Sequence, residues 1–399
     1  MDKACARGLP DGSVETDVAI IGGGLLGCAL AFKLAKAGVD TMLLERGELN
    51  REASGTNAGS LHIQLLRPPG MDEAWLERFR PLVRLHIDAA KAWRGLESEA
   101  GIQVGVRMHG GLFLAETEDE LRILQKKVAV ERAEGLDTTL ISGDEARAMC
   151  PLLAQSVIAA DYCPDDGLAN ALLVTPALAR RAMDYGACVA THHEVLAITI
   201  RGVNDFLLDT TKRQVRAQRV VVAAGPWTGR VAKMVGMDLP IGPNVLSMNV
   251  TEAQRPELDL LIQHIGRRLT LKQTESGTYI VGGGWPGEYA ATGNWKGTTV
   301  ESLAGNMGAA VAVLPRIARL RVLRTWAGLG ANTPDWRPII GEYAPAPGFY
   351  VLFAGLGFTL GLTCAQRMAD LLRQPTGAHS AAGTAFAPGR YIESPAGSA

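Results

Sequence analysis

The spacing of apolar residues near the start of the chain predicts a strand, a helix and a second strand in close succession. Val18 to Ile21 is an unbroken apolar run, which is typical of a short buried strand. After a glycine-rich turn, Leu30 and Leu34 continue an apolar pattern with helical spacing that stops at Gly38. Residues 41–45 form another apolar run that ends in a carboxylate. We therefore expect a βαβ unit at this point of the chain.

The rest of the chain mixes helical patterns with short strands. Helices are predicted over residues 72–99, 118–134, 172–185, 300–314 and 357–372. Buried strands like the first return at 219–224 and 348–353, and the segments between them alternate or turn back as hairpins. This predicts an α/β fold in which a discontinuous Rossmann-like domain is interleaved with an α+β substrate domain built on a largely antiparallel sheet.

The predicted domain boundaries follow from the places where buried strands of the first type recur along the chain. Residues 16–101, 156–235 and 325–374 are assigned to the Rossmann-like domain. Residues 102–155 and 236–324 are assigned to the substrate domain. The two ends, 1–15 and 375–399, are polar or rich in small residues and are expected to be flexible tails.

The turn of the first βαβ unit has the spacing G-x-G-x-x-G, formed by Gly22, Gly24 and Gly27. Between a strand and a helix, this spacing lets the backbone approach a pyrophosphate while the helix N-terminus offers free N–H groups. Glu45 ends the second strand about 20 residues downstream, where a ribose hydroxyl needs an acceptor. A glycine turn in an ordinary βαβ unit is the alternative interpretation. The combination of strand, turn, helix and carboxylate favours dinucleotide binding.

Residues 53–62, which follow the second strand, are rich in small side chains and glycine. Such a backbone can pass close to a flat ligand and offer it N–H donors. A flexible surface loop is the alternative, and the position directly after the ribose-binding strand favours ligand contact.

Composition excludes several classes of function. The chain has 399 residues, of which 47% are hydrophobic and 20% charged, so it is long enough for two or three globular domains. A net charge of −1 gives no field that would attract nucleic acid. No apolar run approaches the length of a membrane span, and the polar N-terminus does not resemble a signal peptide. Six scattered cysteines without C-x-x-C favour reduced thiols, and no metal site is predicted.

Six motifs in a fixed order resemble the FAD-dependent D-amino-acid oxidase superfamily, and the likeness spans about residues 17–372. They are Asp17–Gly27, Glu45-Arg46, Ser54-Gly55, Val220–Trp227, Trp326–Gly341 and Ala354–Gly361. Relatives of this kind include glycine oxidase, D-amino-acid dehydrogenase, the sarcosine oxidase β subunit, and the flavin subunits of hydrogen cyanide synthase and opine oxidase. The resemblance implies that FAD is the cofactor.

The resemblance also implies which residues contact FAD, from the pyrophosphate to the pyrimidine end of the flavin. These are Gly22, Gly24, Leu25, Leu26, Gly27, Glu45, Arg46, Ser54, Asn57, Ala58, Gly59, Val195, Ala224, Gly225, Trp227, Gly328, Gly357, Phe358, Thr359 and Leu360. The last four begin a helix whose free N–H groups would stabilise negative charge on reduced flavin.

The implied reaction oxidises the C–N bond of an amino acid or secondary amine, such as a D-amino acid, an imino acid or an opine, by hydride transfer to flavin. Two departures from relatives bear on the substrate and the acceptor. The carboxylate-clamping arginine that follows Trp-Ala-Gly in amino-acid oxidases is missing, because Gly328 leads to Asn332 without an arginine. Oxygen-using sarcosine oxidases place a lysine where this chain has Ile280. We therefore expect an electron acceptor other than oxygen.

Four side chains are candidates for the catalytic site. His62 closes the small-residue loop, and a hydrogen-bonded structural histidine is its alternative role. The phenol groups of Tyr279 and Tyr289 could donate to a substrate carboxylate or serve only as pocket walls. Arg324 shares a strand face with Trp326 and is either a pocket cation or an ion-paired surface residue.

Three other functions remain open at this stage. One is an oxygen-using glycine or D-amino-acid oxidase, and another is an FAD-holding subunit that acts only within a hetero-oligomer with electron-transfer subunits. The third is an NAD(P)-dependent dehydrogenase, which flavin absorbance would exclude. The expected partner is a small-molecule amino acid or amine, with no nucleic acid and no membrane span. The expected location is the cytoplasm, with the inner face of the membrane as an alternative.

Overall fold

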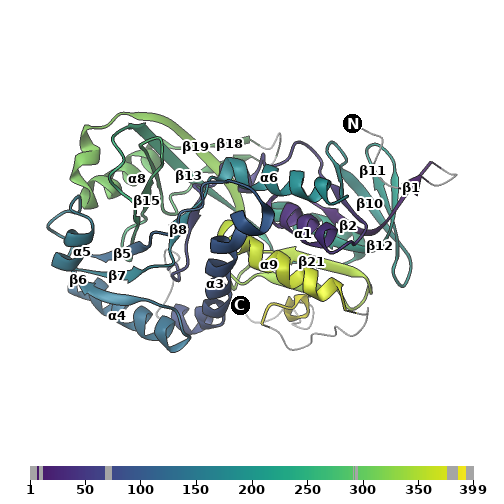
Figure 1. Cartoon of the computed structure of the whole chain (residues 1–399), viewed down its shortest axis with the longest axis horizontal. Coiled ribbons are helices and arrows are strands. Elements are labelled where there is room, and N and C mark those ends of the chain that lie inside the picture. The colour runs from purple at the N-terminus through teal and green to yellow at the C-terminus, as the bar shows by residue number, and fades with distance from the viewer. Residues whose placement is uncertain are drawn as a thin grey trace.

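The computed structural model describes residues 7–8, 12–67, 74–290, 292, 295–374 and 385–391. Two large sheets lie side by side, the first at the right of Figure 1 and the second at the left, with a long helix, α3, between them. The α-helices are α1 (Leu25–Lys36), α2 (Ala53–Thr56), α3 (Trp75–Ala100), α4 (Glu118–Ala133), α5 (Gly143–Met149), α6 (Ala171–Asp184), α7 (Thr228–Ala232), α8 (Val300–Val313) and α9 (Gly357–Leu372).

The first sheet is the predicted Rossmann-like sheet. Its strands are β1 (Arg7–Gly8), β2 (Val14–Ile21), β3 (Thr41–Leu44), β9 (Cys188–Ala190), β10 (Val195–Gly202), β11 (Asp205–Thr210), β12 (Gln214–Val222), β20 (Ile339–Glu342) and β21 (Phe349–Phe353). At its centre β21, β12, β2, β3 and β9 run parallel to one another. The carboxyl ends of β2 and β3 therefore meet at one edge, where ligands of open α/β sheets bind.

The second sheet is largely antiparallel, as expected. Its order is β19 (Val322–Asn332), β13 (Gly242–Ala253), β16 (Thr278–Gly282), β15 (Thr270–Gln273), β14 (Leu261–His264), β5 (Gly111–Ala115), β7 (Ala159–Cys163) and β6 (Thr139–Ser142). Among these strands the pair β14–β5 is parallel. Two small ribbons, β4 (Ser60–Leu61) with β8 (Gly167–Leu168) and β17 (Glu288–Ala290) with β18 (Trp295–Gly297), complete the described strands.

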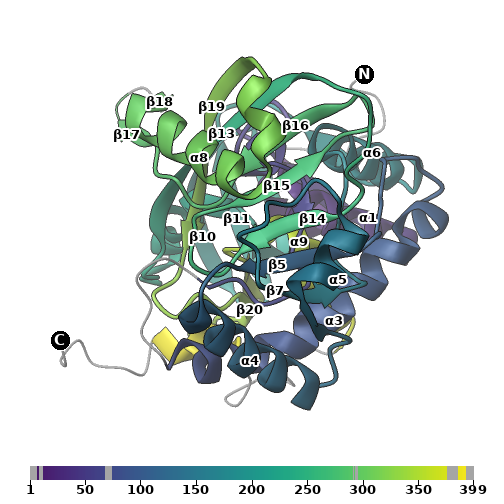
Figure 2. The same cartoon turned by 90° about the vertical axis from the view of Figure 1, so that its left-hand side faces the viewer.

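Alternate residues of the second sheet face two different environments. Leu112, Ile262 and Leu271 pack with α5 and α8 in an apolar core on the outer face, which is turned toward the viewer in Figure 2. The residues next to them in sequence face the other way, because successive side chains of a strand point to opposite faces. Gln263 and Lys272 therefore lie on the inner face, turned toward the first sheet, and both are buried.

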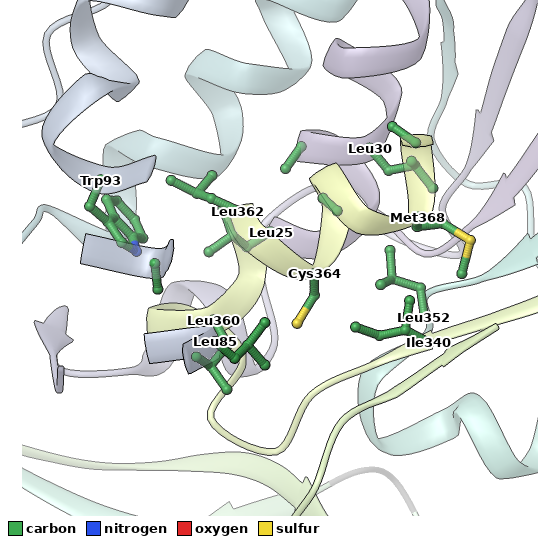
Figure 3. Close-up of a cluster of buried hydrophobic side chains, with 14 of the residues drawn as sticks. Leu25, Leu30, Leu85, Trp93, Ile340, Leu352, Leu360, Leu362, Cys364 and Met368 are labelled. Atoms are coloured by element: carbon green, nitrogen blue, oxygen red, sulfur yellow. The ribbon is translucent and has the colours of Figure 1, made fainter. Parts of the chain in front are cut away.

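Helices α1, α3 and α9 pack against one another in a second apolar core. Leu25 and Leu30 of α1 pack with Leu360, Leu362 and Met368 of α9 in the core drawn in Figure 3, together with Trp93 of α3 and two residues of β20 and β21. The Trp93 indole donates a hydrogen bond to the Thr359 carbonyl at 2.8 Å. This packing fixes the N-terminal turn of α9 against the glycine turn before α1.

Several details differ from the sequence predictions. Strands β7 and β19 belong to the second sheet, although the ranges 156–235 and 325–374 assigned β7 and all of β19 after residue 324 to the Rossmann-like domain. Val14 already lies in β2 and Phe386 packs in the core, contrary to the flexible tails expected at 1–15 and 375–399. Residues 1–6, 9–11, 375–384 and 392–399 of these tails lie outside the described residues. Cys188 is disulfide-bonded, contrary to the expectation of thiols alone, whereas Cys28, Cys150, Cys163 and Cys364 are free.

Candidate active site

A cavity of about 690 Å³ lies between the two sheets. The first sheet contributes the turn after β2, the end of β3 and the first turn of α9, and the second sheet contributes β13, β19 and the turn between β14 and β15. Its size falls within the range of pockets that enclose cofactors and small ligands.

One end of the cavity is formed by the predicted dinucleotide turn. Gly22 has φ of +120°, a conformation that L side chains rarely adopt, and a Cβ on Gly27 would collide with the Gly22 carbonyl oxygen. The Ser54 hydroxyl accepts a hydrogen bond from the Leu25 N–H at 2.9 Å, and Glu45 accepts one from the Gly23 N–H at 2.7 Å. The α1 N-terminus, Ser54 and Glu45 thus converge at this end of the cavity.

Beside this turn, a cation lies over an aromatic ring. The Arg46 guanidinium lies 3.7 Å from the centre of the Trp227 ring and forms an ion pair with Glu52 at 3.3 Å. Glu52 also pairs with Lys296 of β18. Val195 lines the same part of the cavity. These contacts give the end of the cavity beyond Glu45 a rigid, partly aromatic wall.

The loop that begins at α2 runs along the middle of the cavity. The Trp326 indole donates a hydrogen bond to the Thr56 carbonyl at 2.7 Å, which ties the loop to β19. A Cβ on Gly328 would approach the Thr56 hydroxyl to 2.7 Å, so the two backbones pass very close together. Facing this loop, the first turn of α9 has no side-chain cap. Its N–H groups are available to a ligand.

The structure brings together nearly all of the residues predicted to contact the cofactor. All of them line the cavity except Gly27, which packs beneath the turn, and Gly59. Gly59 lies just behind the wall: a Cβ built on it would be 3.0 Å from Lys272 Nζ.

Of the four candidate catalytic residues, only His62 lines the cavity. Tyr279 is fully buried in the outer core of the second sheet, because its place in β16 turns it away from the cavity. Tyr289 lies in the β17–β18 ribbon, and Arg324 is exposed on β19. Neither is part of the cavity lining.

Three buried polar residues near His62 were not predicted from the sequence. Gln263 and Asp166 form a hydrogen-bonded chain with the His62 ring, and Lys272 is 2% exposed. Burial and, to a smaller extent, nearby Arg107 lower the pKa of Lys272 to about 7. For Gln263 and Lys272 the only indication in the sequence was the alternation of apolar and polar residues along β14 and β15, which places one polar side chain on the inner face of each strand.

Arginines elsewhere in the chain are alternatives to the missing clamp. Arg324 is exposed on β19, and Arg337 donates to the Arg78 carbonyl. Arg267 pairs with Glu116 and lines the cavity together with Arg67 and Arg268.

Within the described ranges, no group of three or more His, Cys, Asp or Glu side chains is arranged to hold a metal ion. None of the helices in the described part of the chain combines the length and apolar character that a membrane crossing requires.

Comparisons with known proteins extend over nearly the whole chain. Residues 17–371 match the family described as FAD-dependent oxidoreductases, DAO. The chain is 30% identical over 359 residues to the B subunit of opine oxidase from Rhizobium meliloti, covering 87% of this chain and 90% of that protein. It is 28% identical to the glycine oxidase of Geobacillus kaustophilus (strain HTA426), covering 84% and 86%. The crystal structure of glycine oxidase from Geobacillus kaustophilus superposes with a TM-score of 0.79 at 27% identity, covering 92% of this chain and 97% of that one.

Proposed function

Because this chain belongs to the DAO family of FAD-dependent oxidoreductases, we propose that it oxidises an opine-type secondary amine and passes the electrons to an acceptor other than oxygen. The broader assignment is that of an FAD-dependent oxidoreductase acting on a C–N bond of amino acids or amines. A D-amino acid and an imino acid are the other substrates considered.

The cavity fits FAD. The glycine turn lines the cavity with bare backbone: a Cβ on Gly22 would collide with the Ala223 carbonyl, and one on Gly24 would approach the Ser54 hydroxyl to 3.1 Å. The uncapped N-terminus of α9 faces the other half of the cavity. The residues that would hold the cofactor are the glycine turn, Glu45, Ser54 and the first turn of α9. FAD held there would supply the acceptor for a hydride from the carbon beside the amine nitrogen. The chain itself binds and orients the amine and excludes water.

The observation that carries the proposed substrate is the placement of cations in the cavity. Arg67, Arg267 and Arg268 line the cavity, on two separate segments, whereas β19 contributes Asn332 at the position considered for a clamp. An opine carries a secondary amine between two carboxylates, and a guanidinium is well suited to bind each carboxylate. The likeness to one subunit of an opine oxidase supports the same substrate class.

The test is anaerobic mixing of the purified flavoprotein with opines, D-amino acids and proline derivatives, followed as loss of flavin absorbance at about 450 nm. We expect opines to bleach the flavin, and Arg268→Met to raise the apparent Kd for opines more than for D-alanine. Bleaching by simple D-amino acids but by no opine would contradict the proposal. A colourless protein that does not take up FAD would contradict it at the level of the cofactor.

The acceptor is tested separately, because one observation favours an oxygen-using enzyme. Lys272 lies directly opposite Ile280 in the β15–β16 pair, so a buried amine is present at this point of the sheet although residue 280 is apolar. We expect turnover with an artificial dye acceptor and little hydrogen peroxide in air. Stoichiometric peroxide formation would instead assign the oxidase function.

A hetero-oligomer would supply the acceptor. Two relatives are named as single subunits of larger enzymes, an opine oxidase and a sarcosine oxidase, and they support such an assembly. Leu172 and Leu173 at the start of α6 are 66% and 48% exposed and offer an apolar contact. Copurification of the chain with proteins encoded beside it would be expected, and full dye-linked activity of the chain alone would exclude a requirement for them.

A further inference from the structure

A continuous chain of buried hydrogen bonds leads away from the His62 ring. His62 Nδ1 lies 2.9 Å from Gln263 Oε1, and Gln263 Nε2 donates to Asp166 Oδ2 at 2.9 Å. Asp166 follows β7 in the turn before β8, and Gln263 lies on the inner face of β14. Neither side chain has exposed surface.

The Asp166 carboxylate fixes the direction of every hydrogen bond in this chain. Its Oδ1 accepts from the Ile63 N–H at 2.6 Å and the Gln64 N–H at 3.1 Å. Its Oδ2 accepts from the side-chain amides of Gln64 and Gln263, both at 2.9 Å. Four donors satisfy an ionised carboxylate, which only accepts. Burial raises the pKa of Asp166 to about 6, so the group remains ionised at neutral pH.

The amide orientation of Gln263 then decides where the His62 proton sits. Because Gln263 must present its NH₂ group to Asp166, its carbonyl oxygen faces His62, and Nδ1 must carry the hydrogen. Nε2 is left without a hydrogen and has no hydrogen-bond partner among the described residues. Burial, together with the neighbouring Lys272 of β15 and His86 of α3, lowers the pKa of His62 to about 4, so the ring is neutral.

We propose that Asp166 and Gln263 are positioning residues that keep the proton of neutral His62 on Nδ1, so that Nε2 accepts a hydrogen bond from the N–H of the substrate amine. This inference rests on the proposed amine oxidation and deepens it. One acceptor on the cavity wall fixes the rotation of the amine about its C–N bond and therefore the direction of its lone pair. The role requires a primary or secondary amine, because a neutral tertiary amine has no N–H to donate.

Asp166→Asn makes the proposal testable on the protein itself. The backbone N–H groups of Ile63 and Gln64 would hold the asparagine oxygen in the place of Oδ1, which puts its NH₂ group in the place of Oδ2. The Gln64 amide, whose oxygen accepts from Lys127, would lose its acceptor there. Gln263 would then turn its oxygen to that NH₂ group and present its own NH₂ group to His62. The His62 proton would have to move to Nε2, and the ring would become a donor toward the cavity.

The readout is the ¹⁵N NMR spectrum of the histidine rings in the FAD-bound protein, with His62 assigned by its absence from His62→Gln. We expect the Nδ1–H tautomer in the unmodified protein and the Nε2–H tautomer in Asp166→Asn. The exchanged pair Asp166→Asn/Gln263→Glu should restore Nδ1–H, because the introduced carboxylate accepts from both neighbours. Asp165→Asn is the matched control, because Asp165 is paired with Arg94 near the surface and should leave the tautomer unchanged.

An Nε2–H tautomer in the unmodified protein would overturn the proposal, as would an unchanged tautomer in a folded Asp166→Asn protein. If that variant does not fold, Gln263→Leu serves instead, because removing the acceptor should leave a mixture of both tautomers. With any amine that bleaches the flavin, Asp166→Asn should lower the bleaching rate about 10- to 100-fold, the effect of one lost and one opposed hydrogen bond. If no amine bleaches the flavin, the proposed function is wrong, and the NMR spectra still test separately whether Asp166 and Gln263 set the His62 tautomer.

Discussion

The buried lysine of α4 gives the most direct test of how the cavity wall is held together. Lys127 has no exposed surface, and its ammonium group donates to Glu131 at 2.9 Å, to Asp161 at 2.7 Å and to the Gln64 side chain at 2.9 Å. Lys127→Met keeps much of the apolar stem but leaves two carboxylates and an amide oxygen without their cation. Removing one partner of a buried ion pair costs about 3–5 kcal/mol, and we expect a loss of this size at pH 8.

The pH dependence of this loss distinguishes a charge effect from a packing effect. The two carboxylates raise the pKa of Lys127 above its usual value, so its contribution is fully present below about pH 10.5 and is lost only as the pH rises further. Burial raises the pKa of Glu131, so in the variant this carboxyl takes up a proton more readily as the pH falls. The destabilisation should therefore be clearly smaller at pH 5 than at pH 8.

The assay is urea denaturation followed by tryptophan fluorescence and circular dichroism, using conditions in which both probes report one transition. Lys33→Met is the matched control, because Lys33 pairs with Glu99 near the surface at 2.6 Å. That pair should contribute at most about 1 kcal/mol. The reasoning would be refuted if Lys127→Met cost no more than Lys33→Met at pH 8, or if its cost were the same at pH 5.

Three further outcomes follow from the cavity. Gly27→Ala should abolish FAD retention, measured as flavin absorbance of the purified protein, because its Cβ would collide with the preceding backbone, whereas Gly95→Ala in an open stretch of α3 should retain FAD. Burial penalises the charged form of Lys272 and depresses its native pKa to about 7. Lys272→Met should therefore be more stable than the parent protein below pH 7, by up to about 5 kcal/mol. This difference should vanish above about pH 10.5, where the lysine is neutral in both the folded and the unfolded state. An equal difference at pH 6 and pH 11 in urea denaturation would contradict this assignment. Trp326→Phe removes the 2.7 Å hydrogen bond to the Thr56 carbonyl and should weaken FAD binding about tenfold in a fluorescence titration, with the fold intact by circular dichroism.

Structural features that depend on residues close together in the sequence could be predicted from the sequence. The last helix is predicted at 357–372 and is α9, Gly357–Leu372, because an apolar period, the glycines at its start and Pro375 after its end lie within one short segment. The cofactor turn was equally accessible, because its glycine spacing lies within one short segment and a Cβ on Gly27 would meet the Gly22 carbonyl five residues earlier.

Features that depend on sheet register could not be predicted. Asp166, Gln263 and His62 are far apart in the sequence and meet only because β14, the turn after β7 and the loop after β4 are packed together. Tyr279 shows the same limit, because its position in β16 turns it to the outer face while the neighbouring Ile280 faces inward, opposite Lys272. Which face of an apolar strand lies toward the ligand depends on what packs against the sheet.

The two faces of the second sheet differ in polarity, so the lining of the cavity is sensitive to the register of the strands. In β14, Ile262 lies in the apolar core on the outer face of the sheet, and Gln263 lies among polar residues on the inner face. Deleting a single residue just ahead of this strand would exchange the two environments, leaving an amide among leucines and no acceptor for the imidazole. Changes of even length in the preceding loop preserve this arrangement, so lineages descended from such an enzyme should tolerate paired insertions there more readily than single ones.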